Sequence, residues 1–226
     1  MAFAVIASTV DGDSKSTVTT DAIDTTGADL IVIEVGWYTA GTTPALSDSK
    51  GNTWTGLTAR TQGTFRVRMF YCVSPTVGSG HTFTAAGTDS YPEIGVLAVS
   101  GVNAADAFDQ ESAGGGASAA TSVQPGSVTP DEANCLVVTG LVSEGSSITI
   151  NGGYTAISVN NTGGANMGGG IAYLIQSSAA ATNPTWSWTG SGTAAAAAAV
   201  FHAASGGGGG VVGAQAILSH VAGLGA

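Results

Sequence analysis

Apolar and polar residues alternate along much of this chain with a period of two, which is typical of β-strands rather than helices. The stretches TFRVRMFYCV (64–73) and SITINGGYTAI (147–157) both follow this pattern. The run IGVLAVSG (94–101) is apolar throughout and rich in β-branched residues, as expected of a buried strand. Glycine-rich turn signals such as SKGN, GSGH and NTGG separate these stretches. Short strands with such connections predict an all-β sandwich or barrel.

The chain also contains an internal repeat of about a hundred residues. Residues 16–29 align without a gap on residues 121–134 at an offset of 105, and the same register continues with Leu30 over Cys135. Further matches pair aromatic residues at slightly smaller offsets: Trp54 with Tyr154 at 100, Tyr71 with Tyr173 at 102, and Phe83 with Trp186 at 103. Loops of unequal length account for the drift, so the two halves are predicted to share one strand plan.

This repeat decides how the run of six alanines, Ala194–Ala199, is interpreted. Intrinsic propensity favours a helix for such a run. At an offset of 102, however, the run falls on the apolar stretch 94–101, so the repeat predicts a strand. Small side chains on a buried strand leave space for bulky ones. We expect Trp186 and Trp188 of the preceding strand to fill it.

The predicted architecture is an antiparallel, jelly-roll-like β-sandwich built from two repeated halves. The half-repeats cover about residues 1–102 and 106–204, and residues 103–120 form the crossover between them. From sequence alone the halves could form two stacked sandwiches or one interleaved sandwich; we expect one core over residues 1–204. Residues 205–226 then form a flexible C-terminal tail.

The tail begins with SGGGGG, a hinge-like sequence, and continues as VVGAQAILSHVAGLGA, which has no charged residue apart from a histidine. A mobile terminus is normally polar, so an apolar one is typical of a docking segment. We expect it to insert into a groove on a neighbouring copy or another protein. The candidate docking residues are Val211, Val212, Ile217, Leu218, Val221 and Leu224.

The negative net charge of the chain restricts the kinds of partner that it can bind. Charged residues make up only 9% of the chain, and the formal net charge is −10. A nucleic-acid partner needs a basic stripe and an anionic membrane needs a basic surface, so both are excluded as partners. The N-terminal sequence lacks the pattern of a secretory signal, and no apolar run is long enough to span a membrane, so we expect synthesis in a cytoplasm. The two cysteines, Cys72 and Cys135, are expected to be buried thiols.

Candidate catalytic and metal-binding residues are scattered. No nucleophile motif surrounds His81, His202 or His220. The carboxylates that could serve glycoside hydrolysis show no spacing that selects a pair: Glu34, Asp89, Glu93 and Glu144. Oxygen ligands for a hard cation occur in the turn at Asp11, Asp13 and Ser14, which is more typical of a solvated loop. We therefore expect no enzymatic activity, cofactor or metal.

Exposed aromatic residues are the basis of an alternative function. β-Sandwich modules that bind carbohydrate stack sugars on Trp and Tyr rings. Trp37 precedes Tyr38, so one of the two points away from the core of a strand, and Trp54 follows a turn. Trp37 and Trp54 are the candidate stacking residues of a glycan-binding adhesin module.

Three stretches carry a family resemblance: ADLIVIEVGWYTAGTTPALSDSKGNTWTGL, MFYCVSPTVGSGHTFTAAG and IGVLAVSGV. An aliphatic strand that ends in an aromatic residue, an S-D-S-x-G-N-T-[WY]-T turn, an H-T-x-T strand and a strand closing in S-G-V resemble a β-sandwich domain of tailed bacteriophages and prophages. The likeness covers residues 28–102 and reaches the second half only through the repeat. Its motifs bring no catalytic residues.

This resemblance implies a non-enzymatic structural role in a virion. The expected function is that of a capsid decoration or cement protein, or of a head fibre, bound to the outside of the particle. Its partners would be the major capsid protein or other virion proteins, together with further copies of the chain. The glycan-binding adhesin module of a phage tail or surface protein stays open as the alternative.

Overall fold

The structure is a computed structural model that describes residues 2–12, 15–38, 41–162 and 167–204, without the side chains of residues 158–162. This part of the chain consists of strands and their connections, with no helix and so none that could cross a membrane. The strands are β1 (Ala4–Asp11), β2 (Thr17–Thr19), β3 (Leu30–Tyr38), β4 (Ala45–Asp48), β5 (Thr55–Gly56), β6 (Arg60–Gln62), β7 (Phe65–Val73), β8 (Phe83–Ala86), β9 (Glu93–Ser100), β10 (Phe108–Glu111), β11 (Gly115–Val123), β12 (Cys135–Ser143), β13 (Ser146–Ile150), β14 (Thr155–Thr162), β15 (Met167–Gln176) and β16 (Trp186–Phe201).

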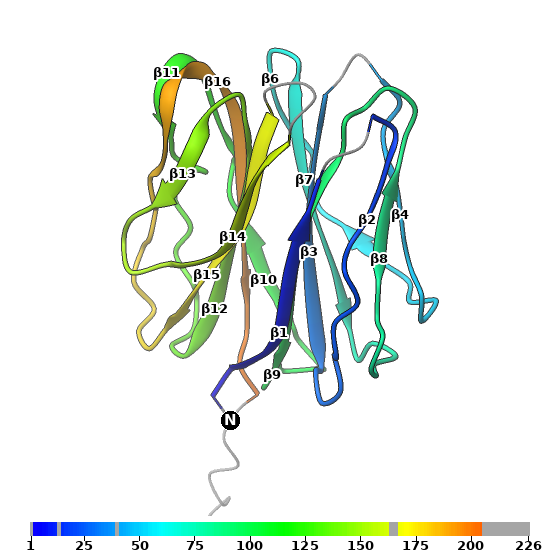
Figure 1. Cartoon of the computed structure of the whole chain (residues 1–226). Coiled ribbons are helices and arrows are strands. Elements are labelled where there is room, and N and C mark those ends of the chain that lie inside the picture. Colours follow the sequence, from blue (N-terminus) through cyan, green and yellow to red (C-terminus); the bar gives the residue numbers. More distant parts are fainter. Residues whose placement is uncertain (1, 13–14, 39–40, 163–166, 205–226) are drawn as a thin grey trace, which may run out of the picture.

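These strands form three sheets that lie side by side as layers (Figure 1). The middle layer is a six-stranded sheet in the order β1-β9-β3-β7-β5, with β6 also paired to β7. On one side lies a three-stranded sheet, β2-β8-β4. On the other lies a seven-stranded sheet in the order β10-β16-β12-β15-β14, with β11 and β13 also paired to β16. The described pairings are antiparallel, so the predicted all-β antiparallel sandwich is confirmed.

The two halves of the chain have the same pairing plan. In the first half β3 lies between β9 and β7, and in the second half β12 lies between β16 and β15. Thr55 pairs with Tyr71, and Thr155 pairs with Tyr173, which matches the sequence offsets of 100 and 102. The outer sheet β2-β8-β4 likewise has a counterpart in β11, the first residues of β16, and β13.

One sequence register is wrong by a single residue. Leu30 pairs with Val99, whereas Leu136 pairs with Phe201, which lies 102 residues after Val99. Leu30 therefore corresponds to Leu136, an offset of 106, and not to Cys135. The error matters because successive residues of a strand face opposite sides. Leu30 and Leu136 both pack between the two large sheets, while Cys135 packs on the far face of the seven-stranded sheet.

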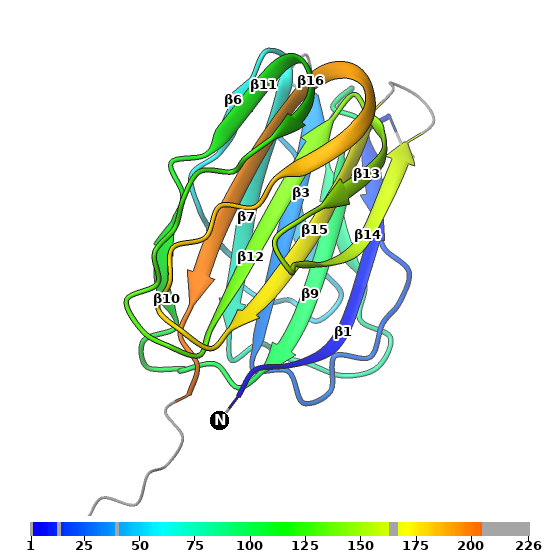
Figure 2. The same cartoon turned by 90° about the vertical axis from the view of Figure 1, so that its left-hand side faces the viewer.

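The polyalanine run is part of a strand, as predicted, because β16 contains Ala194–Ala199. Trp186 and Trp188 pack in the same apolar cluster as Ala194, Ala196 and Ala198, but they lie on β16 itself rather than on a separate strand. The first residues of β16 pair with β13 in the outer layer, and the later ones pair with β12 in the large sheet. Figure 2 shows β16 passing from one layer to the other. Gly190, with φ +89°, lies between Thr189, which pairs with β13, and Ala194, which pairs with β12.

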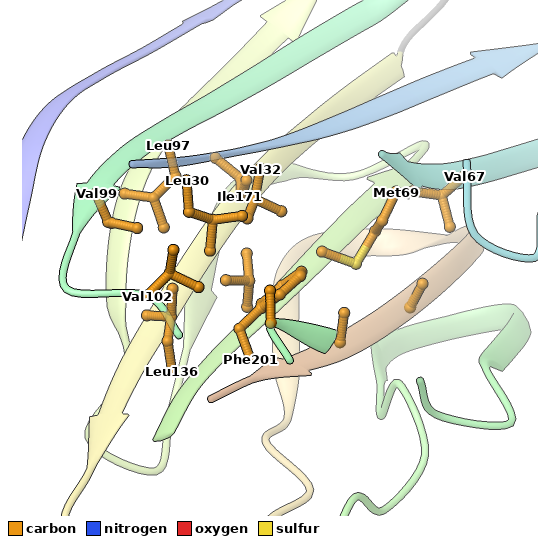
Figure 3. Close-up of a cluster of buried hydrophobic side chains, with 14 of the residues drawn as sticks. Leu30, Val32, Val67, Met69, Leu97, Val99, Val102, Leu136, Ile171 and Phe201 are labelled. Atoms are coloured by element: carbon orange, nitrogen blue, oxygen red, sulfur yellow. The ribbon is translucent and has the colours of Figure 1, made fainter. Parts of the chain in front are cut away.

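Three apolar clusters replace the single core that we expected. One lies between the three-stranded and six-stranded sheets and includes Ile31, Phe83 and Ile94. A second lies between the two large sheets (Figure 3). The third lies on the far face of the seven-stranded sheet around Trp186. Each half thus encloses its own cluster, and the halves join through the middle one.

Candidate functional site

Three groups of titratable side chains in the described structure contain fully or almost fully buried members. One group surrounds His81 in the first half, a second lies between the two large sheets, and a third surrounds His202 where the second half ends. The sequence did not indicate any of these groupings, since the residues of each are far apart along the chain. Each is a candidate site.

The first group places a hydroxyl, an imidazole and a carboxylate in a row. Thr25 Oγ1 lies 2.9 Å from His81 Nδ1, and His81 Nε2 lies 2.9 Å from Asp48 Oδ1. This order is the one used by nucleophilic triads. Thr25 and His81 are fully buried, however, and so is the Asp48 side chain. The Thr25 hydroxyl is thus not accessible to a substrate in this structure.

The carboxylate of Asp48 is the centre of a hydrogen-bond network that explains the SDSKGNTWT motif. It accepts hydrogen bonds from the backbone amides of Lys50 (2.8 Å) and Asn52 (3.0 Å). It also accepts from Asn52 Nδ2 and Trp54 Nε1, each at 3.1 Å. Burial alone would raise the pKa of Asp48, but the hydrogen bonds from His81, Lys50, Asn52 and Trp54 lower it overall. We call Asp48, Asn52, Trp54 and His81 the Asp48 hub.

The second group is a pair of buried glutamates on adjacent strands of the six-stranded sheet. Glu34 on β3 and Glu93 on β9 are fully buried, and none of their four carboxyl oxygens has a hydrogen-bond partner within the described residues. Both face the seven-stranded sheet at glycines. A Cβ atom at Gly140 would overlap Glu34, and one at Gly169 would overlap Glu93. The absence of side chains at these glycines makes room for the carboxyl groups.

The environment of this acid pair favours its protonated form. Burial raises the pKa of Glu34 well above its usual range, and the neighbouring Glu93 carboxyl raises it further. Burial raises the pKa of Glu93 to about 8. The sequence indicated both glutamates as candidates but did not identify them as a pair. The available signal for a buried carboxyl group was a single acidic residue inside an apolar run. A pair enclosed between two sheets cannot contact a sugar, so the geometry does not support glycoside hydrolysis.

The third group surrounds His202, which is almost fully buried just after β16. Its Nδ1 lies 2.9 Å from the carbonyl oxygen of Asp106, and its Nε2 lies 2.8 Å from Asp131 Oδ1 and 3.9 Å from Asp109 Oδ2. Burial lowers the pKa of His202, but the hydrogen bonds to Asp106 and Asp131 and the charge of Asp131 raise it overall. Both ring nitrogens face oxygen acceptors, which suits a protonated imidazolium that fastens the crossover to the end of β16.

Single ligand atoms of Asp109, Asp131 and His202 lie within 4.8 Å of one another, a spacing that a metal ion could use. The same atoms are already engaged in the protein. Asp109 Oδ2 accepts a hydrogen bond from the backbone amide of Asp131 at 3.2 Å, and His202 Nε2 contacts Asp131. The contacts are therefore accounted for by a protonated histidine among carboxylates.

The two candidate stacking residues are not available as sugar platforms. Trp37 is only 2% exposed and packs in the cluster between the three-stranded and six-stranded sheets, so the interpretation of Trp37 as a stacking residue is wrong. Trp54 is half-buried, holds Asp48 through its Nε1 atom, and packs edge-on against Phe83 with ring centroids 6.2 Å apart. The alternation at Trp37 and the turn before Trp54 did not reveal that both rings pack against other residues of the protein.

Other predicted residues fall outside the described chain. Asp13 and Ser14 of the acidic turn are not described, and Asp11 accepts a hydrogen bond from the amide of Gly12 at 2.7 Å. The candidate docking residues Val211, Val212, Ile217, Leu218, Val221 and Leu224 also lie outside the described residues. A shallow surface depression of about 530 Å³ contains no titratable side chain; it is lined by Gly115, Gly116, Ala117, Ser122, Val123, Gln124 and Thr185.

Comparison with known proteins adds no family assignment. Neither the protein-family models nor the curated proteins contain a match to this chain.

Proposed function

We propose that this protein is a non-enzymatic structural component of a tailed-phage virion, bound to the outside of the particle as a capsid decoration protein or a head fibre. The observation that carries the proposal is the Asp48 hub. The resemblance to phage β-sandwich domains rests on short motifs that are separated along the sequence. Asp48, Asn52 and Trp54 come from one motif and His81 comes from another, yet all four meet on one carboxylate. The motifs therefore form one structural unit. This supports the proposed relationship to the phage β-sandwich domains at the level of the fold.

The placement of the titratable groups agrees with a structural role. Thr25, His81 and the acid pair are fully buried, and the His202 group fastens the crossover between the halves. In the part of the chain that is described, the side chains of Thr25, His81, Glu34 and Glu93 therefore support the fold from within. A decoration protein acts through its outer surface, and a stack of sheets with a low content of charge provides extended faces for contact with other virion proteins.

Binding to phage heads tests the proposal directly. The full chain would be mixed with purified heads of the phage or prophage that encodes it, after removal of any copies already attached, and sedimented. We expect the chain to sediment with the heads at a saturating number of copies and to occur in mass spectra of purified particles. A chain that stays in the supernatant and is missing from purified particles would overturn the proposal. Heads that still carry their native complement serve as the control, because their sites are occupied.

A further inference from the structure

We propose that the free edge of β1 binds the C-terminal segment 211–224 of a second copy of this chain as an additional β-strand. This association between copies does not depend on the virion assignment. Addition of a strand to a sheet edge supplies main-chain hydrogen bonds, and apolar side chains on alternate positions supply specificity. Three observations carry the proposal: the chemistry of the β1 edge, the position from which the tail leaves, and the direction in which it leaves.

β1 is an edge strand whose protection is limited to one ladder irregularity near its start. It ends the strand order of the six-stranded sheet and pairs only with β9 in the described structure. Edge strands are normally blunted by lysine or proline, and β1, with the sequence AVIASTVD, has neither. Val5 and Ile6 on this strand are 37% and 39% exposed, and they are two of the three large exposed aliphatic residues in the described part of the chain.

The opposite edge of the six-stranded sheet is less suitable. β5 is only two residues long, and β6 carries Arg60, whose side chain donates to the carbonyl oxygen of Ser112 next to β11. A ladder irregularity between Val5 and Ala7 distorts the start of β1, but Ala7 to Asp11 pair regularly with β9 and leave a straight edge. The straight part offers unpaired backbone groups, and the exposed aliphatic side chains of Val5 and Ile6 lie just before it, at the irregularity.

The tail leaves the described structure beside the start of β1. The backbone amide of Ala204 donates to the carbonyl oxygen of Gly101 at 2.7 Å, and a Cβ on Gly101 would lie 2.6 Å from the carbonyl oxygen of Ala2. Figure 2 shows the end of β16 and the N-terminal end of the chain at the same end of the molecule. Residues 205–210 span up to about 20 Å when extended. The sixteen residues that follow exceed the eight residues of β1.

The direction in which the tail leaves favours binding to β1 of a second copy over binding to β1 of the same molecule. Because β1 starts where the tail leaves, a tail that adds to its own β1 directly after the hinge runs parallel to it. The described pairings are antiparallel, and a parallel pair is slightly less stable per residue. Two copies related by a two-fold axis can instead exchange tails in antiparallel orientation, with both joints identical. The chain carries a net charge of −10, whereas residues 211–224 carry no acidic or basic residue other than His220, so contact is least repulsive there.

The test uses full-length chains and matched substitutions. Ile6→Lys places a charge on the β1 edge, and Ile175→Lys is the control, because Ile175 on β15 is 40% exposed. The double substitution Ile217→Asp and Leu218→Asp alters the tail alone. Light scattering on size-exclusion peaks would give the mass of each variant. Val5→Lys replaces Ile6→Lys if thermal unfolding shows that the latter is misfolded.

We expect the unmodified chain and Ile175→Lys to have at least twice the monomer mass. The edge and tail variants should be monomers, with association weakened by at least about 10-fold by the unpaired charge. A mixture of Ile6→Lys chains with tail-variant chains retains one intact edge and one intact tail, so it should regain a dimer. A monomeric unmodified chain would overturn the proposal and leave the virion proposal standing. Equal loss of association in Ile175→Lys, or no recovery in the mixture, would also overturn it.

Discussion

The two halves of this protein have one pairing plan but close equivalent loops with different chemistry. In the first half His81 bridges to Ile23, and in the second half Thr182 bridges to Val128 at the corresponding place. His81 belongs to the Asp48 hub, whereas Thr182 makes a single side-chain hydrogen bond of 3.1 Å to the hydroxyl of Tyr154. The same strand plan is therefore compatible with a charged network and with one neutral hydrogen bond. The apolar pattern specifies the plan, and the polar contacts add stability to it.

The two faces that meet in the middle of the molecule differ in a similar way. The six-stranded sheet contributes Glu34 and Glu93, and the seven-stranded sheet contributes glycines opposite them. The two halves also distribute side-chain size differently between equivalent positions. Phe83 and Ile94 pack together in the first half, and Trp186 packs with Ala196 at the equivalent positions of the second. The smaller side chain of Ala196, compared with Ile94, is thus compensated by the larger side chain of Trp186, compared with Phe83, which keeps the packing dense.

The largest difference between the halves should appear when the Asp48 hub loses its carboxylate. Asp48→Ala leaves His81, Trp54 Nε1 and two backbone amides without their acceptor. Removal of one partner from a buried ionic network costs about 3–5 kcal/mol, so the free energy of unfolding should fall by that amount. Denaturation in urea would measure it. A loss below about 1 kcal/mol would contradict a structural role for the hub and would remove the distinction between the halves.

The acid pair should make stability depend on pH. A carboxyl group with a raised pKa binds its proton more tightly in the folded than in the unfolded state. Stability is then fully present below the ordinary pKa near 4.5 and is lost as pH rises toward the folded pKa of about 8 for Glu93. We expect the free energy of unfolding to fall across this window, by roughly 1 kcal/mol per pH unit for each carboxyl that takes part.

Glu93→Gln keeps the shape of the side chain and removes its titration. The variant should lose the part of this pH dependence that belongs to Glu93, so the slope of the unfolding free energy between about pH 5 and 8 should fall, while buried Glu34 keeps the remainder. Asp89→Asn is a matched control, because Asp89 is an exposed carboxylate in the same half of the chain. A slope that persists in Glu93→Gln and disappears in Asp89→Asn would assign the pH dependence to the surface instead.

The exchange of side-chain size can be tested with one substitution and its compensation. Ala196→Ile gives the second half the residue that the first half has at the equivalent place, Ile94, but under a tryptophan. Overpacking of this kind costs about 1–3 kcal/mol. The added change Trp186→Phe should restore part of the loss, since it recreates the pairing of the first half. Additive destabilisation in the double variant, measured by chemical denaturation, would show that the two positions do not compensate.

Much of this fold was accessible from the alternation of residues and from the repeat. The repeat predicted correctly that Ala194–Ala199 is a strand, because a tertiary pairing outweighs helix propensity in so short a run. The register of Cys135 was missed by one residue, since an aliphatic run that is buried on both faces does not reveal which side chains face which layer. The pairing of Glu34 with Glu93 depends on the contact of two strands that are distant in sequence, so no local pattern could show it.

The smallest predicted difference concerns the neutral hydrogen bond of the second half. Tyr154 is buried, and burial raises its pKa to about 12, so its hydroxyl stays protonated near neutral pH and can bond to Thr182. Tyr154→Phe removes this one bond while the ring keeps its packing, which should cost about 1 kcal/mol. Trp54→Phe is the matched change in the first half, and it should cost more because its Nε1 donates to the carboxylate of Asp48. The two losses would be measured by denaturation under the same conditions. Equal losses would mean that the hydrogen bond from Trp54 to the charged carboxylate of Asp48 stabilises the protein no more than the neutral hydrogen bond between Tyr154 and Thr182.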